Sequence, residues 1–238
     1  KGEKVVAMNH AAIERGATDF KKIDVPAVAD AIALLGAEVV VLNEVYGAGA
    51  HPAYTAQAEE LAGKLGYHFY FAPAIEFENE GPYGNAFLSR FPILEAQTVP
   101  VPTVPRNHPG YFEDRCAFRA VVESNKKRYT VIGIHFGLQP EEQEQCVKTV
   151  CRLIDDAVYP VILAGDFNVH PDNPLLEPIR QRLADCGELP DGDDLTFPSD
   201  APKEKIDYVF CSRELTVKSV SVPQMVVSDH LPVVVEVE

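Results

Sequence analysis

The sequence predicts an α/β fold in which helices pack on mixed β-sheets. Short apolar runs of the length of a strand recur along the chain, and such runs are typical of buried strands. Segments with apolar residues at helical spacing lie between several of them, as in layered α/β domains. The segments Arg115 to Ser124 and Arg128 to His135 are joined through Asn125-Lys126-Lys127 and predict an antiparallel hairpin. The sheets are therefore expected to be mixed.

The individual elements follow from local patterns. Beyond the first strand at Val5 to Met8, the predicted strands include Val39 to Leu42, Tyr129 to Ile134, Val161 to Ala164 and Ile206 to Cys211. The predicted helices are Val25 to Leu35, Ala58 to Leu65 and Cys146 to Ala157. Asp24 is the expected N-cap of the first helix, and Gly36 and Gly66 are expected to end the first and second helices.

A single folded domain over residues 1–238 is favoured, although length alone would also allow two small domains. Apolar residues make up 46% of the chain and charged residues 24%, which is ordinary for a globular protein with a sizeable core. The sequence has no internal repeat and no linker-like tract. Its apolar runs fall short of the roughly 20 residues that span a bilayer. We expect a monomer, soluble in the cytoplasm or secreted after removal of a leader, because the sequence starts without an initiator Met.

Cysteine content and charge exclude some function classes. The five cysteines are an odd number without a C-x-x-C pair, which disfavours a disulfide framework and a zinc ribbon. We predict free, mostly buried thiols. The net charge of −15 repels polyanions, so long nucleic acid is a less favoured ligand. That argument weakens if a metal ion neutralises part of the carboxylate charge.

Three insertions between strands are expected to shape substrate choice: Tyr46 to Tyr54, Ala74 to Pro82 and Pro100 to Asp114. The proline-rich segment from Val99 to Gly110 predicts a long ordered loop, and such loops often carry binding residues. Tyr111 and Phe112 in this region either contact a ligand or hold the loop in place, and the second interpretation is slightly favoured.

Polar residues follow several apolar strands directly. The residues in these positions are Asn9, Asn43-Glu44, His135, Gly165-Asp166-Phe167-Asn168 and, after Val226-Val227, Ser228-Asp229-His230. Each has an ordinary structural explanation when taken alone, such as a turn asparagine or a core histidine. An ionised carboxylate beside a buried strand is costly unless it is paired or bound to a cation. We therefore expect these strand ends to converge on a metal ion and an anionic ligand.

These residues, taken in order, resemble the endonuclease/exonuclease/phosphatase superfamily. The resemblance spans nearly the whole chain and rests on Asn9, Glu44, Tyr83-Gly84-Asn85-Ala86, Arg115, His135, Gly-Asp-Phe-Asn at 165–168, Ile206-Asp207-Tyr208 and Ser-Asp-His at 228–230. It implies a four-layer αββα sandwich of two mixed sheets, as in DNase I. Ala11 stands where some nucleases of the family carry an acid, and Asn43 stands where a Gln is common.

The expected metal is Mg²⁺, with Mn²⁺ as an alternative. Glu44 is the best candidate ligand because hard cations prefer carboxylate oxygens. Asn9 is expected to assist through its amide oxygen. Asp229 is either a second ligand or a structural acid.

The resemblance also implies the catalytic roles. Asp166 would orient or deprotonate the attacking water, and Asn168 would donate a hydrogen bond to the phosphate. Asp207 and His230 resemble the acid–imidazole pair of the family. The remaining phosphate donors would be His135, Tyr83, Asn85 and Arg115, although Arg115 fits a strand-edge salt bridge equally well.

Three functions remain open. A phosphoesterase that acts on a small or lipid-linked phosphoester is favoured over a DNA or RNA nuclease, and a catalytically silent binding domain ranks third. The sequence has no G-x-S-x-G, H-E-x-x-H or P-loop pattern, so serine-hydrolase, zincin and nucleotide-triphosphatase chemistry is unsupported.

Overall fold

The computed structural model describes residues 2–9, 24–49, 55–77, 81–187, 189 and 194–238, and for residues 6–9 only the backbone. The strands are β1 (Glu3–Asn9), β2 (Val39–Tyr46), β3 (His68–Phe77), β4 (Gly81–Ser89), β5 (Ile93–Pro100), β6 (Cys116–Ser124), β7 (Lys127–His135), β8 (Val161–Asp166), β9 (Ala184–Asp185), β10 (Asp207–Cys211), β11 (Val217–Ser221) and β12 (Val233–Val237). The helices are α1 (Val25–Leu35), α2 (Gln57–Leu65), α3 (Pro140–Asp155), the 3-10 turn η1 (Pro174–Leu176) and α4 (Glu177–Arg180).

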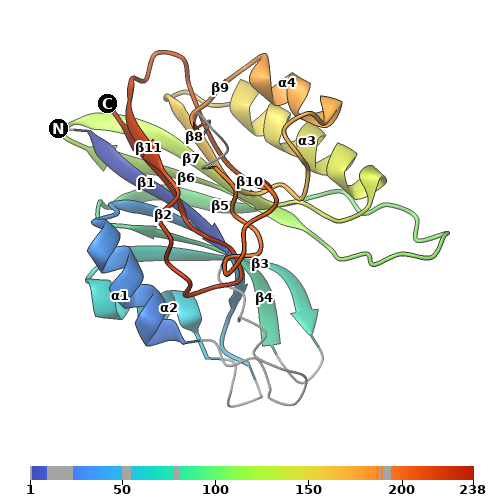
Figure 1. Cartoon of the computed structure of the whole chain (residues 1–238), viewed down its shortest axis with the longest axis horizontal. Coiled ribbons are helices and arrows are strands. Elements are labelled where there is room, and N and C mark those ends of the chain that lie inside the picture. The colour runs from blue at the N-terminus through green and yellow to red at the C-terminus, as the bar shows by residue number, and fades with distance from the viewer. Residues whose placement is uncertain (1, 10–23, 50–54, 78–80, 188, 190–193) are drawn as a thin grey trace.

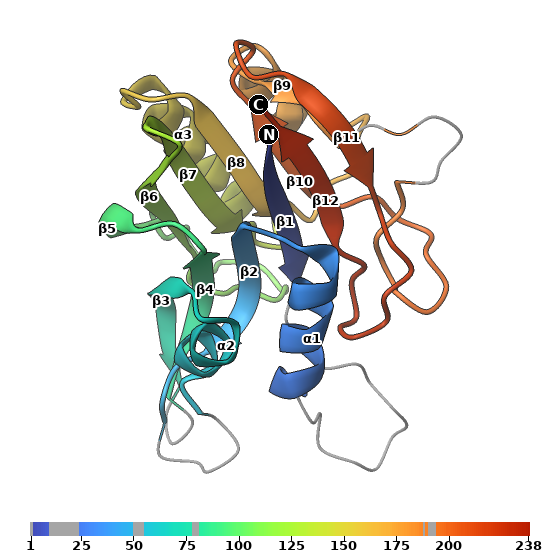
Figure 2. The ribbon, with the colours of Figure 1, turned by 90° about the vertical axis from the view of Figure 1, so that its left-hand side faces the viewer.

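The strands form two six-stranded mixed sheets. One sheet has the order β11-β12-β1-β2-β4-β3 and the other has the order β5-β6-β7-β8-β10-β9. The central pairs β1–β2 and β7–β8 are parallel, whereas the other pairs are antiparallel. Helices α1 and α2 lie outside the first sheet, and α3 and α4 lie outside the second (Figures 1 and 2).

Three apolar clusters hold the layers together. Val41, Phe87 and Phe118 belong to the cluster between the two sheets. A second cluster packs α3 on the outer face of the second sheet, and a third packs α1 and α2 on the outer face of the first. Burial of apolar surface is the main favourable term in folding, so these clusters fix the layer order. The predicted four-layer αββα sandwich is confirmed.

The predicted ends of the first two helices are also confirmed. The Asp24 carboxylate accepts a hydrogen bond of 3.0 Å from the Ala27 backbone N–H, and helix α1 ends at Gly36 with φ of 63°. Helix α2 ends at Gly66 with φ of 69°, a left-handed conformation that glycine adopts without a steric penalty.

Helix α3 begins at Pro140, earlier than the predicted start at Cys146. Its first turns are polar, so the apolar periodicity that marks a helix appears only later in the segment. The start is instead fixed by a capping box between Gln139 and Glu142.

Three local predictions were wrong. Strand β2 does not end at Leu42 but continues through Asn43 and Glu44 to Tyr46, with an irregular register after Leu42. Of the insertion expected from Ala74 to Pro82, the described residues belong to β3 and β4, since Ile75 lies opposite Tyr83 and Phe77 opposite Gly81, and residues 78–80 lie outside the described part. Val226-Val227 is not a strand.

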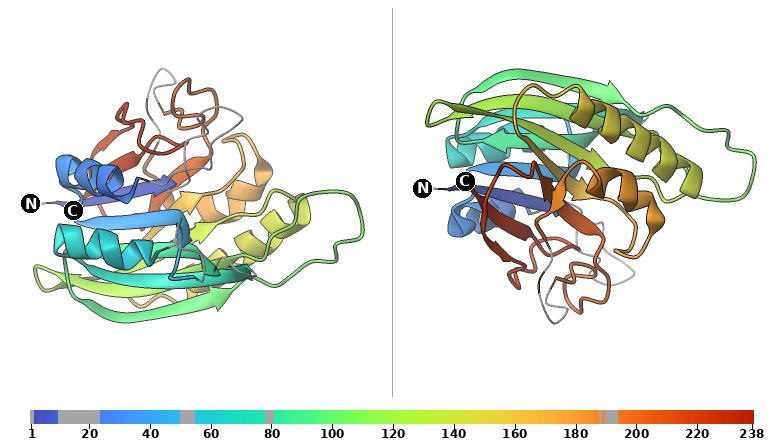
Figure 3. Two further views of the ribbon diagram at one scale, coloured as in Figure 1. Left: turned by 90° about the horizontal axis from the view of Figure 1, so that it is seen from below. Right: turned by 90° about the horizontal axis from the view of Figure 1, so that it is seen from above.

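The predicted β6–β7 hairpin and the long loop are present. Asn125 and Lys126 have φ of 51° and 66°, as a tight two-residue hairpin turn requires. The segment between Pro100 and Cys116 has no regular structure and projects from the body of the protein beyond the N-terminal end of α3 (Figure 3). Of the expected insertion at Tyr46 to Tyr54, residues 50–54 lie outside the described part.

Two further predictions concern the whole chain. All five cysteines are free and buried, as expected. Among the described residues, no helix combines the length and the apolar character that crossing a membrane requires.

Candidate active site

The register of the second sheet places three predicted residues side by side. His135, the last residue of β7, lies opposite Asp166, the last residue of β8. Asp207, the first residue of β10, lies opposite Asp166 on the other side. Because directly opposed residues in a sheet project from the same face, the three side chains emerge together.

The first sheet brings its own polar residues to the same end of the sandwich. Asn9 of β1 lies opposite Asn43 of β2 in parallel register. The side chain of Asn43 reaches across to the second sheet, where its Oδ1 accepts a 2.8 Å hydrogen bond from the Asp166 backbone N–H. The side chain of Asn9 lies outside the described residues, so its predicted metal contact remains a prediction.

An open cleft of about 410 Å³ lies at this end of the two sheets. Most of the predicted site residues line it: Glu44, Tyr83, Arg115, His135, Asp166, Asn168, Asp229 and His230. Asp207 lies behind His230 and is 2% exposed. The sequence therefore identified residues that the fold gathers in one cavity.

Asp207 and His230 form a buried pair. The Asp207 Oδ2 lies 2.7 Å from the His230 Nδ1. Burial lowers the pKa of His230, but Asp207 and the further carboxylates of Asp166 and Asp229 outweigh that effect and raise it to about 10. The ring is therefore an imidazolium at neutral pH, held in one orientation by Asp207.

Asp166 is a buried carboxyl group among other charges. Its Oδ2 lies 3.5 Å from His135 Nε2 and 3.9 Å from His230 Nε2. Burial raises the pKa of Asp166, the Asp207 carboxylate raises it further, and the positive charge of His230 opposes the shift. A carboxyl group with a raised pKa is a stronger base than an ordinary aspartate.

Asn168 completes the turn after β8. Its backbone N–H donates a 2.8 Å hydrogen bond to Asp166 Oδ1, and its side-chain amide donates to the Phe136 carbonyl at 3.0 Å. The backbone at Asn168 has φ of 50°, which asparagine tolerates better than most residues. The turn thus fixes Asp166 and presents the Asn168 amide at the cleft.

Glu44 projects into the cleft from an irregularity in β2. Its φ is 58°, and the β2–β4 register shifts between Leu42 and Val45. A bulge of this kind redirects a side chain, and bulges are common beside active sites. Left-handed backbone at a non-glycine residue is also a form of strain found at functional sites.

The carboxylates of the cleft fit a hard divalent cation. Glu44, Asp166 and Asp229 line it together. Burial raises the pKa of Asp229, and Glu44 contributes to the raised pKa of Asp166. A bound cation would relieve this crowding of negative charge, and oxygen ligands are those that Mg²⁺ selects.

Asp166, Asp207 and His230 form a second group of possible metal ligands. One ligand atom each from Asp166, Asp207 and His230 lies within 4.8 Å of the others. His230 Nδ1 is engaged with Asp207 at 2.7 Å, so only its Nε2 is available. The hydrogen-bonded geometry fits proton transfer better than ligation.

Arg115 and Tyr83 line the same cleft. Arg115 forms a 2.7 Å ion pair with Glu113 and lies 3.1 Å from His135 Nδ1, so it does make the salt bridge that the sequence left open. The pKa of Tyr83 is raised by burial and by Glu44. Its hydroxyl group is therefore protonated and can act as a hydrogen-bond donor.

Asn85 does not line the cleft. It is 2% exposed, its Oδ1 accepts from Asn43 Nδ2 at 2.7 Å, and its Nδ2 donates to the Cys116 carbonyl at 2.8 Å. These partners occupy both ends of the amide. Direct phosphate contact by Asn85 thus stays a prediction that would require the amide to leave this network.

The bridging role of Asn43 was not predicted from the sequence, which placed Asn43 at a strand end and marked it as a departure from the family pattern. The Asn43 amide is 1% exposed and donates to Asn85 Oδ1 at 2.7 Å and to the Ile134 carbonyl at 3.1 Å. Together with the bond from Asp166, these contacts join the two sheets between Glu44 and Asp166. A polar residue inside an otherwise apolar strand was the signal that could have revealed it.

Other cleft residues also lacked a sequence signal. They are Glu113, Leu138, Phe197 and Glu204, together with Tyr111, for which a structural role was slightly favoured. Ile206, which the sequence named beside Asp207, lines the cleft as well. Tyr111 is 58% exposed, and its hydroxyl donates to Glu113 at 3.0 Å. The long loop thus forms one wall of the cleft.

The fold and the cleft define a protein of the DNase I-like class. The model of the Endonuclease/Exonuclease/phosphatase family matches residues 21–230. The chain belongs to this family, whose members are generally divalent-metal-dependent hydrolases of phosphoesters.

Several proteins resemble the chain over nearly its full length. YbhP of Escherichia coli is 27% identical over 98% of this chain and 95% of its own length. The crystal structure of an endonuclease/exonuclease/phosphatase from Bacteroides vulgatus has a TM-score of 0.80 at 20% identity, covering 100% of this chain and 99% of that one. A mannosyl-6-phosphatase of Bacteroides thetaiotaomicron has a TM-score of 0.77 at 17% identity, covering 99% of both chains.

Proposed function

We propose that the protein is a Mg²⁺-dependent hydrolase of a small or lipid-linked phosphoester. The observation that carries this proposal is the convergence of Glu44, Asp166, Asn168 and His230 on one cleft, with Asp207 bonded to His230 at 2.7 Å. Hydrolysis of a phosphoester needs an activated water, neutralised charge at phosphorus and support for the leaving oxygen. The cleft has a candidate for each.

Asp166 acts as the base for the attacking water in this proposal. Its raised pKa suits it to take a proton near neutral pH, and the Asn168 backbone N–H holds it in position. The His230 imidazolium places positive charge beside the phosphoryl group, where it stabilises the negative charge that develops in the transition state. The Asn168 amide, Tyr83 and Arg115 provide further donors.

Glu44 and Asp229 are the proposed metal ligands, with Asn9 as a further ligand. A bound Mg²⁺ or Mn²⁺ would polarise the phosphoryl oxygen or stabilise the leaving group. The crowding of carboxylates in the cleft supports this assignment.

The charges of the cleft favour a small substrate over a polynucleotide. Among the described residues that line it, Arg115 is the single arginine and no lysine occurs, and Arg115 already pairs with Glu113. Affinity for nucleic acid depends largely on lysine and arginine contacts to phosphate. The name of the mannosyl-6-phosphatase suggests a sugar phosphate as one substrate to test.

The test is a substrate panel assayed with Mg²⁺ and with EDTA. It contains p-nitrophenyl phosphate, bis(p-nitrophenyl) phosphate, mannose 6-phosphate, sphingomyelin and plasmid DNA. We expect turnover of a small or lipid-linked compound, and we expect Asp166→Asn and His230→Ala to lower it by about 10²-fold or more. The matched controls Asp200→Asn and His68→Ala change exposed residues outside the cleft.

Each outcome of the panel has a definite meaning. Efficient cleavage of DNA, with affinity falling steeply as salt rises, would identify a nuclease instead. Absence of turnover on every compound would favour a binding domain. Unchanged rates in Asp166→Asn would remove Asp166 from the mechanism.

A further inference from the structure

The surroundings of His135 restrict its protonation state. Its ring is buried, with Nδ1 3.1 Å from the Arg115 guanidinium and Nε2 3.5 Å from Asp166 Oδ2. A guanidinium group has N–H donors and no acceptor. Nδ1 must therefore accept the hydrogen bond from Arg115, which leaves the ring proton on Nε2.

We propose that Arg115 holds His135 as the neutral Nε2–H tautomer, so that His135 donates a hydrogen bond in the cleft and neither takes up nor releases a proton during the reaction. In this arrangement the Nε2–H faces Asp166 and any phosphoryl oxygen bound beside it. The proposal rests on the proposed phosphoester hydrolysis and assigns Arg115 a positioning role within that site.

The electrostatics of the site agree with this geometry. Burial lowers the pKa of His135 well below its usual value, and the positive charges of Arg115 and His230 lower it further. His230 has the opposite environment, because Asp207 engages its Nδ1 and stabilises the imidazolium. The two histidines of the cleft thus differ in charge: His230 contributes a positive charge, and His135 contributes a neutral N–H group.

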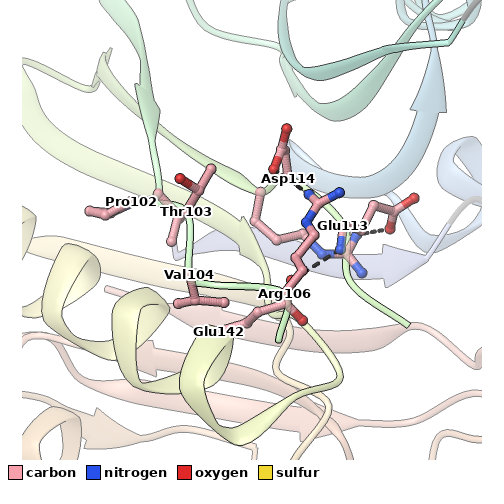
Figure 4. Close-up of a pocket in the computed structure, with 9 residues that line it drawn as sticks. Pro102, Thr103, Val104, Arg106, Glu113, Asp114 and Glu142 are labelled. Carbon is pink, nitrogen blue, oxygen red and sulfur yellow. Dashed lines mark hydrogen bonds and ion pairs between the residues drawn. The ribbon is translucent and has the colours of Figure 1, made fainter. Parts of the chain in front are cut away.

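A chain of contacts from helix α3 fixes Arg115. Glu113 Oε2 pairs with the guanidinium at 2.7 Å, and Glu113 Oε1 accepts from the Tyr111 hydroxyl at 3.0 Å. The backbone N–H of Glu113 donates to Glu142 Oε1 at 3.0 Å. Glu142 belongs to the first turn of α3, and it lines a small pocket together with Glu113 (Figure 4). The loop before β6 therefore orients His135 through Arg115.

Nitrogen NMR of the histidine ring tests the proposal without a substrate. In uniformly ¹⁵N-labelled protein at pH 7, the His135 signals are identified by their loss in His135→Gln. We expect Nδ1 without a proton and Nε2 with one. A protonated Nδ1, whether in the other tautomer or in an imidazolium, would overturn the assignment.

Two loop variants test the role of Arg115. Arg115→Met removes the donor and is expected to give a mixture of tautomers or a protonated ring, whereas an unchanged Nε2–H signature would refute the positioning role. Arg106→Met is the matched control. Arg106 lies on the same loop and lines the same pocket, but it pairs with Asp114 at 2.7 Å (Figure 4), so the His135 signature should not change.

The donor role has its own kinetic test on whichever small substrate of the panel the protein hydrolyses. His135→Ala removes the N–H and is expected to lower kcat by about 10²-fold, the usual effect of losing one preorganised donor. His135→Gln places an amide N–H near the former Nε2 and should restore part of that loss. Equal losses in the two variants would contradict the donor role. If the wild type hydrolyses no phosphoester, the proposed function fails, and the NMR result still decides the tautomer.

Discussion

Replacing Asn43 by alanine is expected to destabilise the protein strongly, because its amide bridges the two sheets. The side chain makes hydrogen bonds of 2.7 Å to Asn85, 3.1 Å to the Ile134 carbonyl and 2.8 Å from the Asp166 backbone N–H. A buried polar group left without its partner costs about 1–3 kcal/mol. With three such groups, Asn43→Ala should lower the free energy of unfolding by about 3 kcal/mol or more, a large share of the roughly 5–15 kcal/mol of an ordinary domain.

Urea denaturation followed by circular dichroism measures this change. Thr130→Val is the matched control: Thr130 is fully buried on β7, and its hydroxyl has no hydrogen-bond partner among the described residues. Its replacement should be neutral or stabilising, since a buried hydroxyl without a partner is costly. A loss below about 1 kcal/mol for Asn43→Ala would refute the bridging role, because even one unsatisfied buried group should cost that much.

Two further predictions concern Glu44 and Gly165. Glu44→Gln should weaken Mn²⁺ binding measured by calorimetry and lower kcat/KM by about 10²-fold or more, because a bound cation contributes several kcal/mol; unchanged Mn²⁺ affinity would exclude Glu44 as a ligand. Gly165→Ala should lower the free energy of unfolding, measured by urea denaturation, by about 2 kcal/mol or more. The φ of Gly165 is 148°, and the new Cβ would lie 1.9 Å from the Ile134 carbonyl oxygen. Gly63→Ala is its control, because Gly63 lies exposed in α2 with nothing within 4 Å, and alanine there should add about 0.5–1 kcal/mol. Equal stability of the two glycine variants would contradict the packing argument.

Much of the second sheet and its site could be predicted because the signals are local. The strand before Asp166 is a continuous apolar run, and β8 ends at Asp166. The capped helix α1 also follows from adjacent residues, Asp24 and Gly36. In each case a few neighbouring residues determine the element, although β8 extends two residues beyond the predicted end at Ala164.

The rest of the site depends on contacts between distant parts of the chain. Asn43 and Glu44 interrupt an apolar run, so the sequence indicates a strand end, whereas Asn43 faces the other sheet and β2 continues to Tyr46. Glu113 acquires its role only when the loop before β6 packs against Glu142 of α3. Val226 carries a strand-forming side chain but is 43% exposed and lies outside any strand. The local sequence does not reveal which surface the fold will cover, so the strand prediction failed there.

The two sheets contribute different parts of the proposed chemistry, and this couples activity to packing. Glu44 comes from the first sheet and Asp166 from the second, so their separation depends on how the sheets pack through residues such as Phe87 and Phe118, whose rings lie 5.5 Å apart. A displacement of about 1 Å at a reacting group can cost about 10²-fold in rate. The Asn43 amide opposes such displacement because hydrogen bonds depend on direction as well as distance, whereas apolar contacts are non-directional. A buried amide at this position therefore holds Glu44 and Asp166 in register, which an apolar side chain of the same size would not do.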